Sequence, residues 1–256
     1  MTNERRVLVH PDKASLAGSV AARFITKVLD ILDMQAVAHV VLTGGSMGAA
    51  VLESIAASPA RTSIDWSRVH FWWGDERWVP AGDPERNDGQ AQQALLDDLD
   101  LPADNVHPFP ASDSGLSLDE AAAVYAAELS EHGVDGLPHP IFDITFLGVG
   151  PDGHVASLFP HRSGIQVTDR TVIPVRNSPK PPPERLSLTR PVINASQRVW
   201  LVLAGADKAS ALGLALAGAS RDEVPVAGIK GRRRTVFFVD ADAAGEVPEG
   251  LIARDY

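Results

Sequence analysis

The stretch of residues 142–160, FDITFLGVGPDGHVASLFP, constrains the fold more than any other part of the chain. It begins with an almost continuous apolar run, which Gly148 and Gly150 bound. A short apolar run without polar alternation, ended by glycines, predicts a strand buried on both faces in the centre of a parallel sheet. The glycine-rich turn that follows permits a tight bend and lets a ligand approach the backbone closely.

Other short apolar runs alternate with segments of helical periodicity along the chain. In the first helical segment Leu16, Val20 and Phe24 recur at helical spacing. Ser117 and Glu120 have the spacing of a capping box at the start of a later segment. Besides the central strand, the pattern predicts strands at 5–10, 39–42, 69–73, 171–175, 185–188, 199–203 and 235–239, and helices at 12–33, 46–57, 87–96, 117–131 and 206–216.

This alternation predicts an α/β fold with an open, mostly parallel, Rossmann-like sheet and helices on both faces. The sequence shows no internal repeat and no linker between two compositions, so we expect residues 1–256 to form a single domain. A Pro-rich segment, residues 177–184, interrupts the pattern, which then resumes. We interpret this segment as a semi-rigid loop over a site.

The composition narrows the classes of function. The absence of cysteine excludes disulfides, thiolate metal sites and a cysteine nucleophile, and it fits a reducing cytoplasm. The formal net charge of -10 argues against a nucleic acid or an anionic membrane as partner. No apolar run approaches the ~20 residues that span a bilayer, and the run at 7–9 is too short for a signal peptide. We therefore expect a cytoplasmic enzyme that acts as a monomer on a small molecule.

Glycine-rich or polar clusters follow four of the predicted strands. They are TGGS at 43–46, GDER at 74–77, GPDGH at 150–154 and GADK at 205–208. Ligands of open α/β sheets bind outside the carboxyl ends of the strands. The agreement of the four clusters therefore predicts one site along a single edge of the sheet.

His154 follows Asp152 by two residues at the end of the central strand. A histidine that exchanges its proton near neutral pH, close to a carboxylate, is suited to general acid–base catalysis. The alternative interpretation is a solvated histidine in a turn that only connects two elements.

Gly44, Gly45 and Ser46 lie between a predicted strand and a predicted helix. Their free backbone N–H groups, the hydroxyl and the helix dipole would form a cradle for an anion. Since no Walker lysine follows, this is not a nucleotide P-loop. The alternative is that the glycines only make the turn and Ser46 only caps the helix.

Two cations near the other strand ends fit the same anion. Arg77 lies beside Asp75 and Glu76, which would hold its planar fork toward an anionic ligand or would only pair with it in a structural salt bridge. Lys208 would lie in the first turn of a helix, against the dipole, which a bound anion would explain; the alternative is a solvated surface lysine.

We also expect Asn87 to cap the helix that follows it. A required metal is not expected, because no HxxxH or ExxH pair accompanies the carboxylates and His154.

The motifs together resemble the signature blocks of the 6-phosphogluconolactonase family, in family order from about residue 43 to residue 208. The wider superfamily includes glucosamine-6-phosphate deaminase, which shares the GGS and DGH elements. The residues after His154 read ASLFP, which is the lactonase version of this block. Arg86 is a departure, because the family often has Ser before the following Asn. The matching blocks are residues 43–46, 73–77, 148–160, 178–189 and 205–209.

The resemblance implies hydrolysis of 6-phospho-D-glucono-1,5-lactone to 6-phospho-D-gluconate, in the oxidative pentose phosphate pathway, without a cofactor. On this basis we expect His154 and Asp152 to be catalytic, and backbone N–H groups of the 148–153 turn to stabilise the oxyanion. The substrate phosphate is expected to bind Gly45, Ser46, Arg77 and Lys208, and further substrate contacts are expected from Gly44, Asp75, Gly153 and Arg185. The alternatives are a deaminase or isomerase acting on glucosamine 6-phosphate, and a non-catalytic sugar-phosphate sensor.

Overall fold

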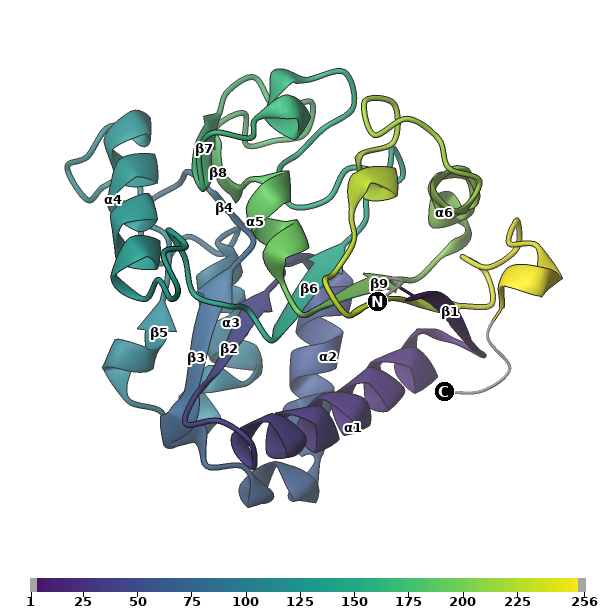
Figure 1. Cartoon of the computed structure of the whole chain (residues 1–256), viewed down its shortest axis with the longest axis horizontal. Helices are drawn as coiled ribbons and strands as arrows, with labels where there is room; N and C mark the ends of the chain where they lie inside the picture. The colour runs from purple at the N-terminus through teal and green to yellow at the C-terminus, as the bar shows by residue number, and fades with distance from the viewer. Residues whose placement is uncertain (1–3, 253–256) are drawn as a thin grey trace.

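The computed structural model describes residues 4–252, which form a large sheet, a small sheet and the helices that cover them (Figure 1). All strand pairs of the large sheet are parallel. The sheet is open, and this confirms the expected fold class. In spatial order its strands are β1 (Glu4–His10), β10 (Arg234–Asp240), β9 (Arg198–Leu203), β6 (Ile144–Gly148), β2 (Ala38–Leu42), β3 (Val69–Trp73) and β5 (Val106–His107).

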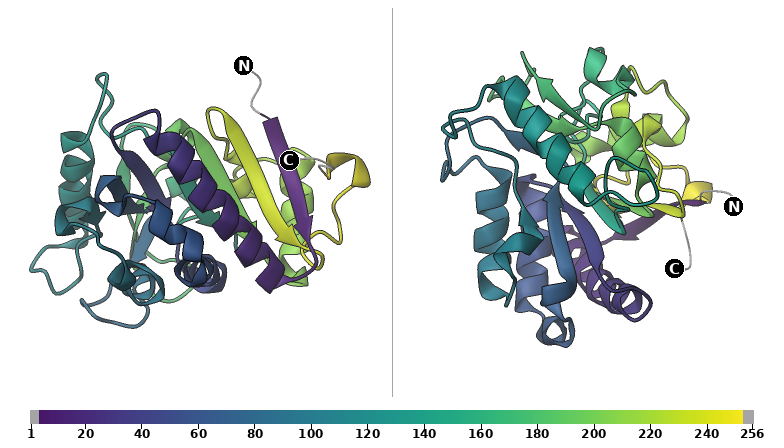
Figure 2. Two further views of the ribbon diagram at one scale, coloured as in Figure 1. Left: turned by 90° about the horizontal axis from the view of Figure 1, so that it is seen from below. Right: turned by 60° about the vertical axis from the view of Figure 1, so that its left-hand side comes forward.

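Helices cover both faces of the large sheet, with α1 and α2 on one face and α4 and α5 on the other (Figures 1 and 2). Helix α1 begins after Asp12, whose carboxylate accepts the N–H of Ser15 at 2.7 Å. Helix α4 begins with the predicted capping box of Ser117 and Glu120. The α-helices are α1 (Lys13–Leu32), α2 (Gly45–Ala57), α3 (Asn87–Ala94), α4 (Leu118–Glu131), α5 (Arg190–Ala195) and α6 (Ala209–Leu216).

Short 3-10 helices connect many of these elements. They are η1 (Pro59–Ser63), η2 (Trp66–Arg68), η3 (Leu96–Asp98), η4 (Ala103–Asn105), η5 (Ser163–Gln166), η6 (Ala206–Lys208), η7 (Pro225–Gly228) and η8 (Glu249–Leu251). The segment predicted as one helix at 206–216 therefore divides into η6 and α6. Within residues 4–252 no helix is long and apolar enough to cross a membrane.

A small antiparallel sheet is the main feature that the sequence did not predict. It contains β4 (Asp75–Arg77), β8 (Arg185–Leu188) and β7 (Val172–Val175), in that spatial order. Strands β7 and β8 were predicted, but β4 was interpreted only as a polar cluster. The three residues of β4 are all charged, so no apolar pattern marks this strand in the sequence. These residues form a strand because they pair with β8.

The order of the large sheet places a topological switch point between β2 and β6. From β2 the chain continues outward to β3 and β5, whereas from β6 it continues in the other direction to β9 and β10, beyond which β1 forms the edge of the sheet. At such a point the loops after the two central strands diverge and leave a crevice at their carboxyl ends. The loops that follow β2 and β6 carry the TGGS and GPDGH clusters.

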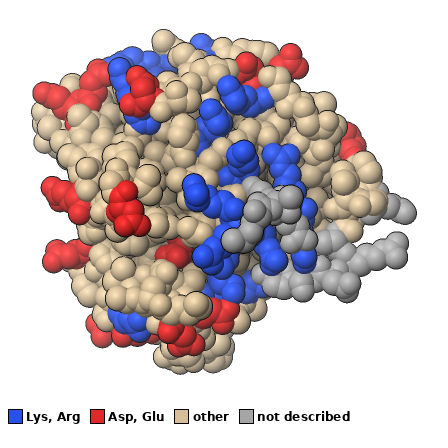
Figure 3. All heavy atoms as spheres, in the orientation of Figure 1, with Lys and Arg blue, Asp and Glu red and all other residues tan. Residues whose placement is uncertain are grey.

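The charged side chains are distributed unevenly over the surface. On the face seen in Figure 3, Lys and Arg gather in a band through the middle, while Asp and Glu lie mostly around it. The net charge of -10 therefore does not describe every part of the surface, and it leaves room for local sites that attract anions.

Candidate active site

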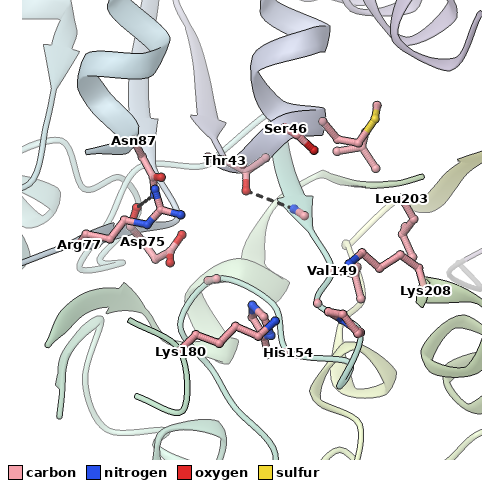
Figure 4. A pocket seen from close by; sticks show the side chains of 18 of the residues that line it. Thr43, Ser46, Asp75, Arg77, Asn87, Val149, His154, Lys180, Leu203 and Lys208 are labelled. Atoms are coloured by element: carbon pink, nitrogen blue, oxygen red, sulfur yellow. Dashed lines mark hydrogen bonds between the residues drawn. The ribbon is translucent and has the colours of Figure 1, made fainter. Parts of the chain in front are cut away.

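A cavity of about 460 Å³ lies at the carboxyl ends of β2, β3, β6 and β9 (Figure 4). Of the ten residues predicted for the site, eight line it: Gly44, Gly45, Ser46, Asp75, Arg77, His154, Arg185 and Lys208. The other two, Asp152 and Gly153, belong to the turn that carries His154. The structure thus brings the four predicted clusters together at one edge of the sheet.

His154 and Asp152 form a close pair. The distance from His154 Nδ1 to Asp152 Oδ1 is 2.5 Å. Partial burial raises the pKa of Asp152, but the hydrogen bond from His154 and the charges of His154 and Lys180 outweigh it and bring this pKa to about 2. Because an ionised carboxylate only accepts, Nδ1 carries the proton and Nε2 is left as the basic nitrogen.

Two glycines allow this turn to form. A β-carbon at Gly150 would lie 2.0 Å from His154 Nδ1, so the imidazole occupies the space of any side chain there. Gly153 has φ +79, and its β-carbon would lie 2.6 Å from Val224 Cγ1. Gly153 therefore shapes the turn, and its role as a substrate contact stays a prediction.

The TGGS loop forms the start of helix α2. Gly44 is the N-cap and makes no side-chain cap, Gly45 has φ +80, and Ser46 lines the cavity. The alternative in which Ser46 caps the helix is therefore wrong. Thr43 Oγ1 accepts the N–H of Gly148 at 3.1 Å and joins the loop to the end of β6. The unpaired N–H groups of the first turn and the dipole of α2 favour an anion there.

Strand β4 forms another wall of the cavity through Asp75, whose carboxylate accepts the hydroxyl hydrogen of Ser157 at 2.7 Å. The next residue, Glu76, is buried and accepts the N–H groups of Asn87 at 2.8 Å and Asp88 at 2.9 Å. Burial is the main cause that raises the pKa of Glu76 to about 7. The prediction that Asn87 caps α3 is wrong, because Asn87 is the first residue of the helix and its side chain makes no cap. The carboxylate of Glu76, on β4, accepts the first N–H groups of the helix instead.

Asn87 instead connects two walls of the cavity. Its Nδ2 donates to the backbone oxygen of Asp75 at 2.8 Å, and a β-carbon at Gly44 would lie 1.8 Å from its Oδ1. A glycine is therefore required at position 44 for this packing. The neighbouring Arg86, where the sequence departs from the family pattern, is buried, donates to both carboxylate oxygens of Asp88 and does not line the cavity.

Four cations line the cavity: Arg77, Lys180, Arg185 and Lys208. Figure 4 shows Arg77 and Lys208 on opposite sides of it, and His154 with Lys180 between them. Lys208 Nζ donates to Asp207 at 2.7 Å, and Arg77 donates to the backbone oxygen of Glu85 at 2.5 Å. Lys180 was not predicted from the sequence; its only signal was a position in the loop expected over the site.

Arg185 lines the cavity and also contacts the Pro-rich loop, while its expected contact with the substrate stays a prediction. Its side chain is buried, and Nε and Nη2 donate to backbone oxygens of the Pro-rich loop. Its Nη1 lies 4.0 Å from Asp75 Oδ2. In the part of the chain that the structure describes, no group of three or more His, Asp or Glu side chains is arranged to hold a metal ion.

Comparison with known proteins agrees with the resemblance found in the sequence. A family model described as glucosamine-6-phosphate isomerases/6-phosphogluconolactonase matches residues 11–238. The chain is 51% identical over 255 residues to 6-phosphogluconolactonase of Streptomyces coelicolor, with 98% of each chain covered. It is 43% identical over 242 residues to 6-phosphogluconolactonase of Mycobacterium tuberculosis, covering 94% of this chain and 97% of that protein.

A solved structure has the same fold. The crystal structure of 6-phosphogluconolactonase from Thermotoga maritima aligns with a TM-score of 0.81 and 29% identity, over 93% of this chain and 100% of that chain. The match to the family model and the two sequence relatives each cover most of the chain. The chain therefore belongs to the glucosamine-6-phosphate isomerase/6-phosphogluconolactonase family.

Proposed function

We propose that the protein hydrolyses 6-phospho-D-glucono-1,5-lactone to 6-phospho-D-gluconate, the second step of the oxidative pentose phosphate pathway. The 51% identity to a 6-phosphogluconolactonase over 98% of the chain supports this substrate. The observation that carries the chemistry is the His154–Asp152 pair, which lies in a cavity lined by cations and by a helix N-terminus. This combination suits an ester-like carbonyl on a phosphorylated sugar.

In the first step, Nε2 of His154 takes a proton from water while the water oxygen bonds to C1 of the lactone. The electron pair of the C1 carbonyl bond moves to its oxygen, which becomes an oxyanion. In the second step, this pair reforms the carbonyl and the bond from C1 to the ring oxygen breaks. The imidazolium returns its proton to the ring oxygen, and the new carboxylic acid ionises. Asp152 holds the Nδ1–H tautomer and stabilises the imidazolium.

We assign the 6-phosphate to Gly45, Ser46 and Lys208. These residues combine helix N–H groups, a hydroxyl and an ammonium on one side of the cavity. Arg77 faces the cavity from the opposite side, so we assign it to oxygens at the other end of the sugar, with Asp75 beside it. Binding the phosphate would hold C1 against His154, which is how remote contacts accelerate a reaction.

We further propose that the chain acts as a monomeric cytoplasmic enzyme, as one sugar-phosphate hydrolase domain, and requires no cofactor, nucleic acid or membrane. The absence of cysteine and the net charge of -10 support this part of the proposal.

The test is to generate the lactone freshly and to follow acid release with and without the protein, subtracting spontaneous hydrolysis. We expect an acceleration that is proportional to protein concentration. Acid release at the spontaneous rate would contradict the proposal. Ammonia release from glucosamine 6-phosphate would indicate the deaminase alternative, and lactone binding without acid release would indicate a sensor.

A further inference from the structure

The Pro-rich loop brings an ammonium group to the catalytic pair. Lys180 lines the cavity, and its Nζ lies 4.0 Å from Asp152 Oδ1, the oxygen that accepts from His154. Figure 4 shows the end of the Lys180 side chain beside His154. This side chain is also one of the causes that lower the pKa of Asp152. Among the four cations that line the cavity, Lys180 is therefore the one whose charged group lies beside the His154–Asp152 pair.

Arg185 fixes the loop in this position. Its Nη2 donates to the backbone oxygens of Lys180 at 3.3 Å and Pro181 at 2.8 Å, and its Nε donates to that of Pro182 at 3.2 Å. One guanidinium thus holds three consecutive carbonyl groups. Because it is only 6% exposed, these bonds compete little with water. The backbone oxygens face Arg185, while the side chain of Lys180 lies in the cavity.

The guanidinium of Arg185 also contacts Phe159, the aromatic ring that packs against His154. Its Cζ lies 5.8 Å from the centre of the Phe159 ring, and that ring lies 4.7 Å from the ring of His154. The loop is closed by two further bonds, from the N–H of Ser178 to the oxygen of Pro183 at 2.9 Å and from the N–H of Lys180 to the hydroxyl of Ser178 at 3.2 Å. Arg185 therefore connects the loop that carries Lys180 to the Phe159 ring that packs against His154.

We propose that Lys180 is a catalytic residue that binds the oxyanion on C1, and that Arg185 is a positioning residue that acts through it. This inference rests on the proposed lactonase function. When water adds to C1, the carbonyl oxygen gains a full negative charge, and an ammonium in a partly enclosed cavity stabilises it more than bulk water would. After the ring bond breaks, the same ammonium faces the carboxylate of the product. Arg185 thus acts on the loop, in place of the substrate contact that the sequence suggested for it.

The experiment compares Lys180→Met, Lys180→Arg, Arg185→Gln and the double variant with wild type, using Lys230→Met as an exposed-lysine control. Loss of one oxyanion donor lowers kcat by about 10²- to 10³-fold in known enzymes. We expect Lys180→Met to lower kcat by about 10²-fold while KM changes little, and Lys180→Arg to recover part of the loss. Arg185→Gln should lower kcat by about tenfold, and the double variant should be no slower than Lys180→Met.

A binding measurement gives a second readout that does not depend on turnover. Calorimetry compares 6-phosphogluconate with glucitol 6-phosphate, which carries the same phosphate but no carboxylate. Wild type should bind the carboxylate ligand more tightly, and Lys180→Met should lose this preference while it binds glucitol 6-phosphate as before. Thermal unfolding identifies any variant that fails to fold, and Arg185→Lys replaces Arg185→Gln if the latter does.

Each remaining result decides a separate point. An active wild type with unchanged kcat and unchanged carboxylate preference in Lys180→Met overturns the role of Lys180 and leaves the proposed function intact. Additive losses in the double variant, with weaker binding of glucitol 6-phosphate by Arg185→Gln, would show that Arg185 contacts the substrate itself. A wild type that does not accelerate hydrolysis overturns the proposed function, and the binding comparison then decides on Lys180 alone.

Discussion

The molecule holds histidines in two contrasting regions of the same sheet. His154 lies alone at the carboxyl end of β6, beside a carboxylate and at the surface of a cavity. A second group, the histidine cluster, lies between β2, β3, β5 and the end of α4, away from the cavity. It consists of His39, His70, His107 and His132.

In the histidine cluster the rings contact one another and the aromatic core. The rings of His70 and His107 stack at 5.3 Å, and the ring of His107 stacks on Trp72 at 3.7 Å. The indole N–H of Trp72 donates to His39 Nδ1 at 3.1 Å, which requires this nitrogen to be unprotonated. Burial, and next the repulsion by its neighbours, lowers the pKa of His39 to about 3 and that of His70 to about 4.

The comparison shows that the surroundings of an imidazole decide what it does. For His39 and His70, burial and like charges disfavour the protonated form, so these two rings act as neutral packing groups at neutral pH. His154 has an ionised partner that stabilises the imidazolium, together with a cavity that admits a reactant. His107 also contacts a carboxylate, that of Glu128 at 2.7 Å, but it does not line the cavity. A group that must accept a proton from a reactant and donate it back needs both the carboxylate and the access that His154 has.

The largest expected effect is on turnover when His154 is replaced. His154→Asn should lower kcat by about 10³-fold, in the range known for loss of a general base, with an unchanged midpoint of thermal unfolding. Steady-state kinetics on fresh lactone and a melting curve measure both. Near-normal kcat would remove His154 from the mechanism and with it the contrast between the two regions.

Asp152→Asn should have the next largest effect. The amide no longer stabilises the imidazolium or selects the Nδ1–H tautomer, so we expect kcat to fall by about 10²-fold with little change in KM. Asp222→Asn, at a position outside the cavity lining, is the matched control. A rise in KM with unchanged kcat would instead indicate that Asp152 contacts the substrate directly.

Replacement of Lys208 should affect binding more than chemistry. Lys208→Met removes an ammonium assigned to the phosphate, and we expect KM to rise about tenfold, equivalent to about 1.4 kcal/mol, while kcat stays within about twofold. Titration with inorganic phosphate should show weaker binding by this variant. An unchanged KM and unchanged phosphate affinity would move the phosphate to another part of the cavity.

The change with the smallest expected effect on turnover concerns the acid stability of the histidine cluster. The pKa values of His39 and His70 in the folded state lie below their ordinary value near 6.5, so between about pH 4 and 6.5 the unfolded chain binds more protons. The free energy of unfolding should therefore fall as pH decreases through this window, by at most about 1.4 kcal/mol per pH unit for each histidine.

Denaturant unfolding at several pH values measures this slope. His70→Asn should flatten it relative to wild type, whereas His161→Asn, at an exposed position, should not. An equal slope in wild type and His70→Asn would show that this histidine is already protonated in the folded protein, or that its burial has no energetic effect.

The sequence predicted the parts of the fold that an apolar pattern marks. The buried runs of β2, β3, β6 and β9 are confirmed, and so is the meeting of four polar clusters at one edge of the sheet. Strand β4 could not be predicted, because its residues are charged and it depends on pairing with a strand more than a hundred residues away. The cap of α3 was missed for a similar reason, since Glu76 reaches it from outside the helix.

The candidate site was predictable in its residue types more than in its geometry. The spacing of Asp152 and His154 fixes a local contact, so the pair was found from the sequence alone. Both Lys180, in the Pro-rich loop, and Arg185, at the start of β8, line the cavity. The burial of Arg185 against the loop depends on three hydrogen bonds to backbone oxygens that no local pattern encodes.

The most direct test of the account is the rate of acid release from fresh 6-phospho-D-glucono-1,5-lactone with wild type, His154→Asn and His70→Asn at pH 7. We expect wild type and His70→Asn to accelerate release equally, and His154→Asn to remain close to the spontaneous rate. Equal acceleration by His154→Asn and wild type, or no acceleration by wild type, would contradict the account.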